Sequence, residues 1–151
     1  MKNKKALKVG VAAVGVVVAL TMAGYAQAGP EVTITFKNNS DSKAIYDVVG
    51  SSAYSYTEAN PKPMPEVQAH ESDVYRVRGA QSPDVTIVVF QYKMGAKTCK
   101  FTTSYLKLPS RSGTVPKWNK SEQSLGGARC EARITGTDFA THDWAVEFSM
   151  K

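Results

Sequence analysis

The chain has 151 residues, of which 42% are apolar and 21% charged, and this length suits one compact domain. The composition excludes a collagen, a wholly disordered chain and a protein with several membrane spans. The formal charge of +6 is not a nucleic-acid signature, because four of the lysines precede residue 9. Beyond Ala28 there are 15 basic and 13 acidic residues, a net charge of +2. That is too little to match the phosphates of DNA or RNA, so we expect no nucleic-acid partner.

The first 28 residues have the layout of a secretory signal peptide. Residues 1–8 form a segment with four lysines, an apolar run covers residues 9 to about 24, and residues 26–28 read Ala-Gln-Ala. We expect cleavage after Ala28, so that residues 29–151 form a secreted or periplasmic protein of bacterial type. The alternative is an uncleaved anchor, since an apolar run of about 16 residues approaches the length that crosses a bilayer. A lipid-modified cysteine is excluded, because no cysteine lies near this segment.

The sequence contains two cysteines, Cys99 and Cys130. In an oxidising compartment such a pair most often forms a disulfide. Closing a loop of about 30 residues would stabilise the fold by roughly 3–4 kcal/mol. A metal or redox pair fits less well, because the chain has no C-x-x-C motif and no histidine near either cysteine. We expect the bridge to join two strands, with Trp144 packed beside it.

Apolar and polar residues alternate with a period of two along most of the exported part, and this pattern predicts strands. No window shows a sustained helical period. The run 85–92 is apolar on both faces, which is typical of a central strand. The predicted strands cover residues 32–37, 43–49, 72–78, 85–92, 98–105, 128–134 and 142–150.

About seven strands with mostly short polar connections predict an all-β protein. We expect a single antiparallel β-sandwich of immunoglobulin-like or Greek-key type over residues 29–151, with an open barrel as the alternative. Tyr54 and Tyr56 are expected to extend an edge strand. The segment 60–65 contains three prolines and is expected to be a crossing loop, because proline cannot donate a ladder hydrogen bond.

The residues that could support catalysis are few. The histidines are His70 and His142, no G-x-S-x-G motif occurs, and neither a D-x-D-x-D-G loop nor an H-E-x-x-H pair is present. Gly126-Gly127 lacks the rest of a phosphate-binding loop and is expected to form a turn or bulge at a strand entry. We therefore expect no catalytic site, no metal and no cofactor. A hydrolase with an atypical site built on the histidines is the alternative.

The segment 106–124 is longer than a tight hairpin needs and is interpreted as a functional loop. It contains Trp118 among cations, of which Lys117, Lys120 and Arg111 are the candidate binding residues. An indole beside cations suits a sugar, a lipid headgroup or a protein partner. The alternative is that Trp118 folds back over an open end of the sandwich. Tyr54 and Tyr56 form a second candidate surface.

These patterns indicate an exported, non-catalytic β-sandwich that binds a partner protein or a surface glycan through its loops. Two other functions remain open from the sequence. The first is a membrane-active or toxin-like protein whose aromatic, cationic loop touches lipid. The second is a secreted inhibitor that inserts this loop into the cleft of a foreign enzyme.

Overall fold

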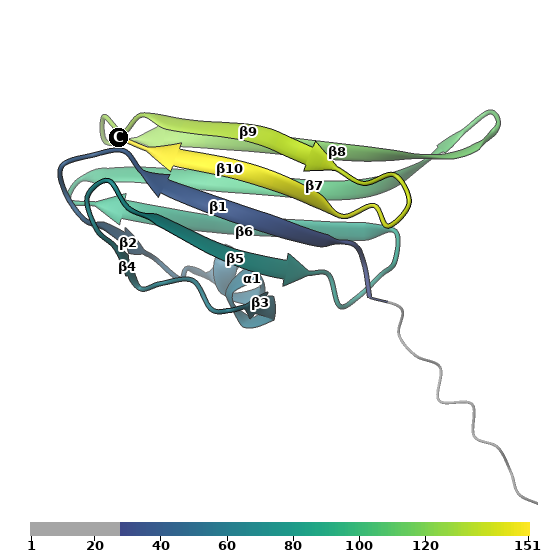
Figure 1. Ribbon diagram of the computed structural model, residues 1–151, viewed down its shortest axis with the longest axis horizontal. Coiled ribbons are helices and arrows are strands. Elements are labelled where there is room, and N and C mark those ends of the chain that lie inside the picture. Colours follow the sequence, from purple (N-terminus) through teal and green to yellow (C-terminus); the bar gives the residue numbers. More distant parts are fainter. Residues whose placement is uncertain (1–27) are drawn as a thin grey trace, which may run out of the picture.

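The computed structural model describes residues 28–151, which form two five-stranded sheets packed face to face (Figure 1). Sheet A has the order β3 (Ala59–Asn60), β5 (Ser72–Arg78), β1 (Glu31–Asn38), β10 (Trp144–Met150) and β9 (Cys130–Thr137). Sheet B has the order β4 (Glu66–Val67), β2 (Ala44–Tyr46), β6 (Val85–Met94), β7 (Lys97–Ser110) and β8 (Gly113–Leu125). The predicted all-β sandwich is confirmed, and neither sheet closes into a barrel.

The centre of sheet A is a parallel pair of the first and last long strands. Residue Val32 of β1 lies opposite Trp144 of β10, and Asn38 lies opposite Met150. The other strand pairs of both sheets are antiparallel. Alternate residues of β1 and β10 are buried, as their sequence patterns predict, because successive side chains of a strand point to opposite faces.

Aromatic rings fill the space between the sheets. Phe36 of sheet A stacks on Tyr92 of sheet B with ring centroids 3.5 Å apart and an interplanar angle of 4°. Phe148 meets Phe90 edge to face at 5.0 Å, and it contacts Phe101 at 4.8 Å. All five side chains are buried. These contacts fix the spacing of the two layers by packing large rings from both sides.

The predicted disulfide is present and joins the two sheets. Cys99 lies on β7 of sheet B and Cys130 on β9 of sheet A, with their Cα atoms 5.6 Å apart. The expectation that Trp144 packs beside the bridge was wrong. Cys130 lies opposite Met150, whereas Trp144 lies opposite Thr137 at the far end of the β9–β10 pair. The indole of Trp144 instead donates a hydrogen bond to Thr103 Oγ1 at 2.9 Å.

The segment predicted as a long loop, 106–124, is a β-hairpin. Strands β7 and β8 pair continuously from Thr98↔Leu125 to Ser110↔Gly113. Strand β6 pairs with β7 only as far as Val85↔Leu106, so the hairpin extends past it. Residues 107–116 therefore form a two-stranded projection, here called the arm, which is seen at the upper right of Figure 1.

Tyr54 and Tyr56 do not extend a strand. They lie in the short helix α1 (Ala53–Glu58), which follows the 3-10 turn η1 (Gly50–Ser52) and packs beside β6. The proline-rich segment after α1 crosses between the layers as expected, since it connects β3 of sheet A with β4 of sheet B. The strands that the sequence analysis missed are β3, β4 and β8, of which the first two have only two residues each.

Most of the predicted signal peptide lies outside the described residues. Within 28–151, no helix has the length and apolar character needed to cross a membrane. The first buried residue of this part is Gly29, whose N–H donates to the carbonyl oxygen of Gly79 at 2.6 Å.

Candidate functional site

One stretch of a central strand lacks a neighbour on one side. Strand β2 pairs with β6 only at Tyr92 and Lys93, and the N–H of Asp47 then donates to the carbonyl oxygen of Gln91 at 3.0 Å. At this point the chain turns away into η1 and α1. The part of β6 from Val85 to Val89 therefore has a full strand partner, β7, along one edge only.

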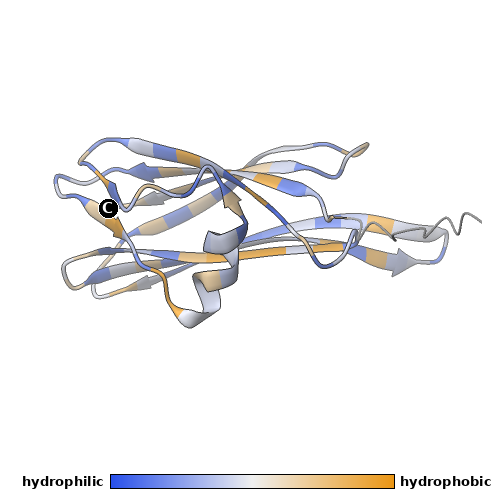
Figure 2. Ribbon diagram, turned by 90° about the horizontal axis from the view of Figure 1, so that it is seen from below, coloured by the Kyte–Doolittle hydropathy of each residue, from blue (hydrophilic) through white to orange (hydrophobic). Residues whose placement is uncertain are grey.

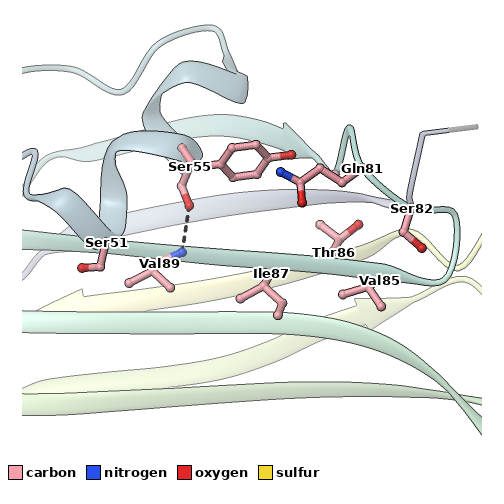
Figure 3. A pocket seen from close by; sticks show the side chains of 10 residues that line it. Ser51, Ser55, Gln81, Ser82, Val85, Thr86, Ile87 and Val89 are labelled. Atoms are coloured by element: carbon pink, nitrogen blue, oxygen red, sulfur yellow. Dashed lines mark hydrogen bonds between the residues drawn. The ribbon is translucent and has the colours of Figure 1, made fainter. Parts of the chain in front are cut away.

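The hydrogen-bond alternation of β6 decides which of its backbone groups are free. Lys107 N–H donates to Asp84 O at 2.9 Å. The backbone N–H and C=O groups of even-numbered β6 residues therefore point toward β7, and those of odd-numbered residues point toward the open edge. Ser55 of α1 caps this edge at one point, because its Oγ accepts the N–H of Val89 at 2.9 Å (Figure 3). Within residues 28–151, no partner takes the N–H or the C=O of Ile87.

The open edge forms one wall of a groove of about 360 Å³. The opposite walls come from η1 and α1, with Ser51 and Ser55, and from the turn after β5, with Gln81 and Ser82 (Figure 3). The hydroxyl of Tyr54 accepts the N–H of Ala80 at 3.0 Å and so ties α1 to that turn. None of the residues that line the groove is charged. The groove thus offers unpaired backbone groups among apolar and small polar side chains.

Polar contacts anchor Asp47, the first residue after β2, to β6. Lys93 Nζ lies 2.7 Å from Asp47 Oδ2, and the side-chain amide of Gln91 also donates to that carboxylate. The hydrogen bond from Lys93, followed by that from Gln91, lowers the pKa of Asp47. These contacts fix the residue at which β2 leaves β6, and so they fix where the open edge begins.

The two candidate tyrosines face different surroundings. Tyr54 lines the groove and is 37% exposed. Tyr56 packs on the ring of Tyr46 at 5.7 Å, and Lys62 Nζ lies 5.5 Å from its ring centroid. Only Tyr54 therefore belongs to the groove.

Trp118 packs back onto the sandwich, which was the alternative considered for it. Trp118 lies opposite Tyr105 of β7 and points to the inner side of β8, with the two ring centroids 5.9 Å apart. Its Nε1 donates to the carbonyl oxygen of His142 at 3.0 Å, and Phe139 meets its ring edge to face at 5.1 Å. Phe139, 70% exposed, is the aromatic residue of this cluster that faces solvent most. The indole N–H is thus already used within the protein.

The candidate cations are spread over both faces of the hairpin. Lys117 and Trp118 are adjacent in β8, so their side chains point to opposite faces. Lys120 shares the face of Trp118 and lies 3.6 Å from Glu122. Arg111 is in the turn between β7 and β8. Since β6 and β7 lie between α1 and β8, the tyrosines and the hairpin residues do not form one surface.

The histidines have structural partners. His70 Nε2 lies 2.9 Å from Asp41 Oδ1, and His142 Nδ1 lies 2.9 Å from the hydroxyl of Tyr105, whose pKa is raised by burial. Both histidines have positive φ angles, 62° and 65°, at turns. In the part of the chain that the structure describes, no three His, Cys, Asp or Glu side chains gather closely enough to hold a metal ion.

Comparisons with protein-family models, with curated proteins and with solved structures give no match. The groove must therefore be interpreted from its own geometry. Tyr54 was predicted from the sequence, whereas Ser55, Gln81 and Ile87 of this groove were not, and these three come from separate segments of the chain. The available signal was the central strand 85–92, although the sequence does not show that β2 stops short of covering it.

Proposed function

We propose that this protein is an exported, non-catalytic binding domain that takes up an extended segment of a partner protein at the open edge of β6. The observation that carries the proposal is that the N–H and C=O of Ile87, at the wall of a preformed groove, have no partner among residues 28–151. An extended peptide can add to such an edge by main-chain hydrogen bonds, while pockets beside the edge select its side chains. An uncovered strand edge is also a feature that proteins usually protect.

The groove supports a short, uncharged segment. The open edge runs from Val85 to Val89, but Ser55 binds the N–H of Val89 and the carbonyl of Val85 lies close to Gly29 and Gly79. At about 3.3 Å per residue this leaves room for roughly three residues of partner strand. The apolar side chains of Val85 and Ile87 favour a partner with apolar or small side chains at alternate positions.

A surface glycan bound at Trp118 is less well supported than a peptide in the groove. The Nε1 of Trp118 donates to His142 O, and its ring packs against Tyr105 and Phe139. Export is supported by the predicted signal peptide and by the disulfide, since disulfides persist mainly in oxidising compartments.

The test is a selection of random linear heptapeptides displayed on phage, followed by affinity measurements on the enriched peptides. The blocking variant is Ile87→Lys, because a lysine at an open edge interferes with strand addition and this side chain is already 48% exposed. The matched control is Val74→Lys, which changes an exposed valine of β5 in the other sheet, 51% exposed. Thermal unfolding establishes that both variants fold.

We expect Ile87→Lys to weaken peptide binding at least about tenfold and Val74→Lys to change it less than about twofold. N-methylation of alternate peptide nitrogens should abolish binding, and the amide of Ile87 should exchange with solvent more slowly in the complex. Enriched peptides that bind both variants equally, or that tolerate N-methylation at every position, would contradict strand addition. Failure of any peptide to enrich would also count against the groove as a peptide site.

A further inference from the structure

A long part of the chain contains basic residues but no acidic ones. From residue 85 to residue 121 there is no Asp or Glu. The segment covers β6, β7 and most of β8, the three long strands of sheet B. Its basic residues are Lys93, Lys97, Lys100, Lys107, Arg111, Lys117 and Lys120.

The fold neutralises fewer than half of these cations. Lys93 pairs with Asp47, Lys107 with Asp84 and Lys120 with Glu122, at 2.7, 3.2 and 3.6 Å, and all three acidic partners lie outside the segment. The other four have no ion pair within residues 28–151.

Strand alternation places several of the cations on the outer face of sheet B. Phe101 and Tyr105 of β7 are buried against sheet A, so Lys100 points outward, and Lys117 lies opposite Leu106 on the same outer side. Arg111 is at the tip of the arm. We call the outward-pointing side chains of β6, β7 and β8, together with Arg111, the cationic face.

Apolar side chains share this face with the cations. Leu108 and Val115 lie opposite each other on the outer side of the arm, and Val115 is 46% exposed. Val85 and Ile87 of β6 continue the apolar surface toward the groove, and both are exposed. In Figure 2 the arm extends well past the body of the sandwich, with apolar positions along it. A flat, projecting surface of cations and apolar side chains, with no acidic residue on its three strands before Glu122, is complementary to an anionic bilayer surface.

We propose that the cationic face docks the protein on anionic lipid membranes. The unpaired cations supply attraction to the headgroups, and Leu108 and Val115 of the arm enter the boundary between headgroups and acyl chains. The lipid surface is favoured over a protein partner because the face is broad, its three strands have no acidic residue before Glu122, and Leu108 and Val115 lie on a projecting arm. The peptide groove shares Val85 and Ile87 with this face, but none of the residues that line it is charged, so charge variants on β7 and β8 leave the lining of the groove unchanged.

The first experiment measures co-sedimentation of the purified protein with vesicles of phosphatidylcholine containing phosphatidylglycerol, and with vesicles of phosphatidylcholine alone. The test variant is Lys100→Glu/Lys117→Glu. The control is Arg129→Glu/Lys151→Glu, which makes the same change of net charge at exposed positions outside this face that have no ion pair with any residue of the described part, 28–151. All variants share one N-terminus, so any contribution of residues 1–27 cancels.

We expect wild-type binding to the anionic vesicles only, reduced at least about tenfold in the test variant and less than about threefold in the control. Binding should also fall steeply as salt is added, because exposed charges are screened over about a Debye length. Equal binding to neutral vesicles, or equal losses in both double variants, would overturn the proposal.

The second experiment tests whether apolar side chains enter the lipid. Val115→Ser is compared with Val74→Ser, since the two valines have similar exposure, 46% and 51%, but lie on opposite sheets. We expect Val115→Ser alone to weaken vesicle binding, about two- to fivefold. Binding that is unchanged by Val115→Ser while the protein binds dextran sulfate as tightly as vesicles would identify a general polyanion site and overturn the lipid assignment. A change of oligomeric state in Val115→Ser, measured by sedimentation, would indicate a protein interface instead.

Discussion

The two outer faces of the sandwich organise their charges differently. On sheet A, Glu147 lies between Lys37 and Arg133, with N–O distances of 2.7 and 3.2 Å, and Arg78 lies 3.5 Å from Glu31. On sheet B, the long strands have no acidic residue before Glu122 with which their lysines could pair. Lys37, Arg78 and Arg133 of sheet A are therefore paired with acids of the same sheet, whereas four of the seven cations between residues 85 and 121 have no ion pair within residues 28–151.

On sheet A, ion pairing also changes the pKa of one acid, Glu147. The hydrogen bond from Lys37, together with the charges of Lys37 and Arg133, lowers the pKa of Glu147. Surface ion pairs contribute little to stability, about 0–1 kcal/mol each, so this arrangement matters mainly for what the face can attract. The comparison predicts that charge changes on the two sheets will have different effects, provided that the sheets stay joined.

The largest expected effect comes from removing the disulfide that joins the two sheets. In Cys99→Ala/Cys130→Ala the bridge between β7 and β9 is lost, and we expect the free energy of unfolding to fall by about 2–5 kcal/mol. Urea unfolding measures the loss. Wild-type protein treated with dithiothreitol should approach the stability of the variant. A loss below about 1 kcal/mol would mean that the ring packing between the sheets holds them without the bridge.

A smaller effect distinguishes the two faces of a single strand. Trp118→Ala removes a half-buried indole and its hydrogen bond to His142 O, and we expect a loss of about 1–3 kcal/mol, less than the 3–5 kcal/mol of a fully buried ring. Lys117→Ala, on the outer face, should change stability by less than about 0.5 kcal/mol. Thermal or urea unfolding of both variants tests this, and Trp118→Phe should recover part of the loss. Similar values for the two alanine variants would contradict the assigned orientation of β8.

The smallest effect tests the ion pairs of sheet A. Glu147→Gln should lower the free energy of unfolding at pH 7 by about 0.5–1 kcal/mol, because Lys37 and Arg133 lose their partner. The folded pKa of Glu147 is lowered, so its contribution is present above the unfolded pKa of about 4.3 and is lost as the pH falls through the folded pKa. The difference between wild type and variant should therefore vanish on acidification.

The same variant also sharpens the comparison between the faces. With Glu147 neutralised, sheet A gains two unpaired cations but no apolar arm. If vesicle binding needs both features, Glu147→Gln should bind anionic vesicles no more than about twofold better than wild type. A larger increase would show that unpaired cations alone are sufficient.

The sequence predicted the parts of the fold in which one strand face is buried. The alternation in β1, β5 and β10 was correct, and so was the pairing of Cys99 with Cys130. Strand β8 was missed because most of its side chains are exposed on both faces, which removes the period-two signal. Helix α1 was missed because six residues are too few to show a helical period.

The candidate site was less predictable for a different reason. The groove depends on where β2 stops and on how residues from separate segments meet, and neither is encoded in local periodicity. Pro116 shows how another edge of the same sheet is protected. The backbone N–H groups of even-numbered β8 residues point away from β7, toward the free edge of the sheet. A proline at residue 116 therefore removes a donor that another chain could use. No proline occupies the open stretch of β6.

The parallel pairing of β1 with β10 also has a practical consequence for handling the molecule. The described chain starts at the end of the sandwich that bears the arm and finishes at the opposite end (Figure 1). The length of β10 alone, about 23 Å, separates these two ends. A fluorophore or a surface tether attached after Lys151 would leave the arm unobstructed. A circular permutant of residues 29–151 that joins Lys151 to Gly29 would need a linker of at least about seven extended residues.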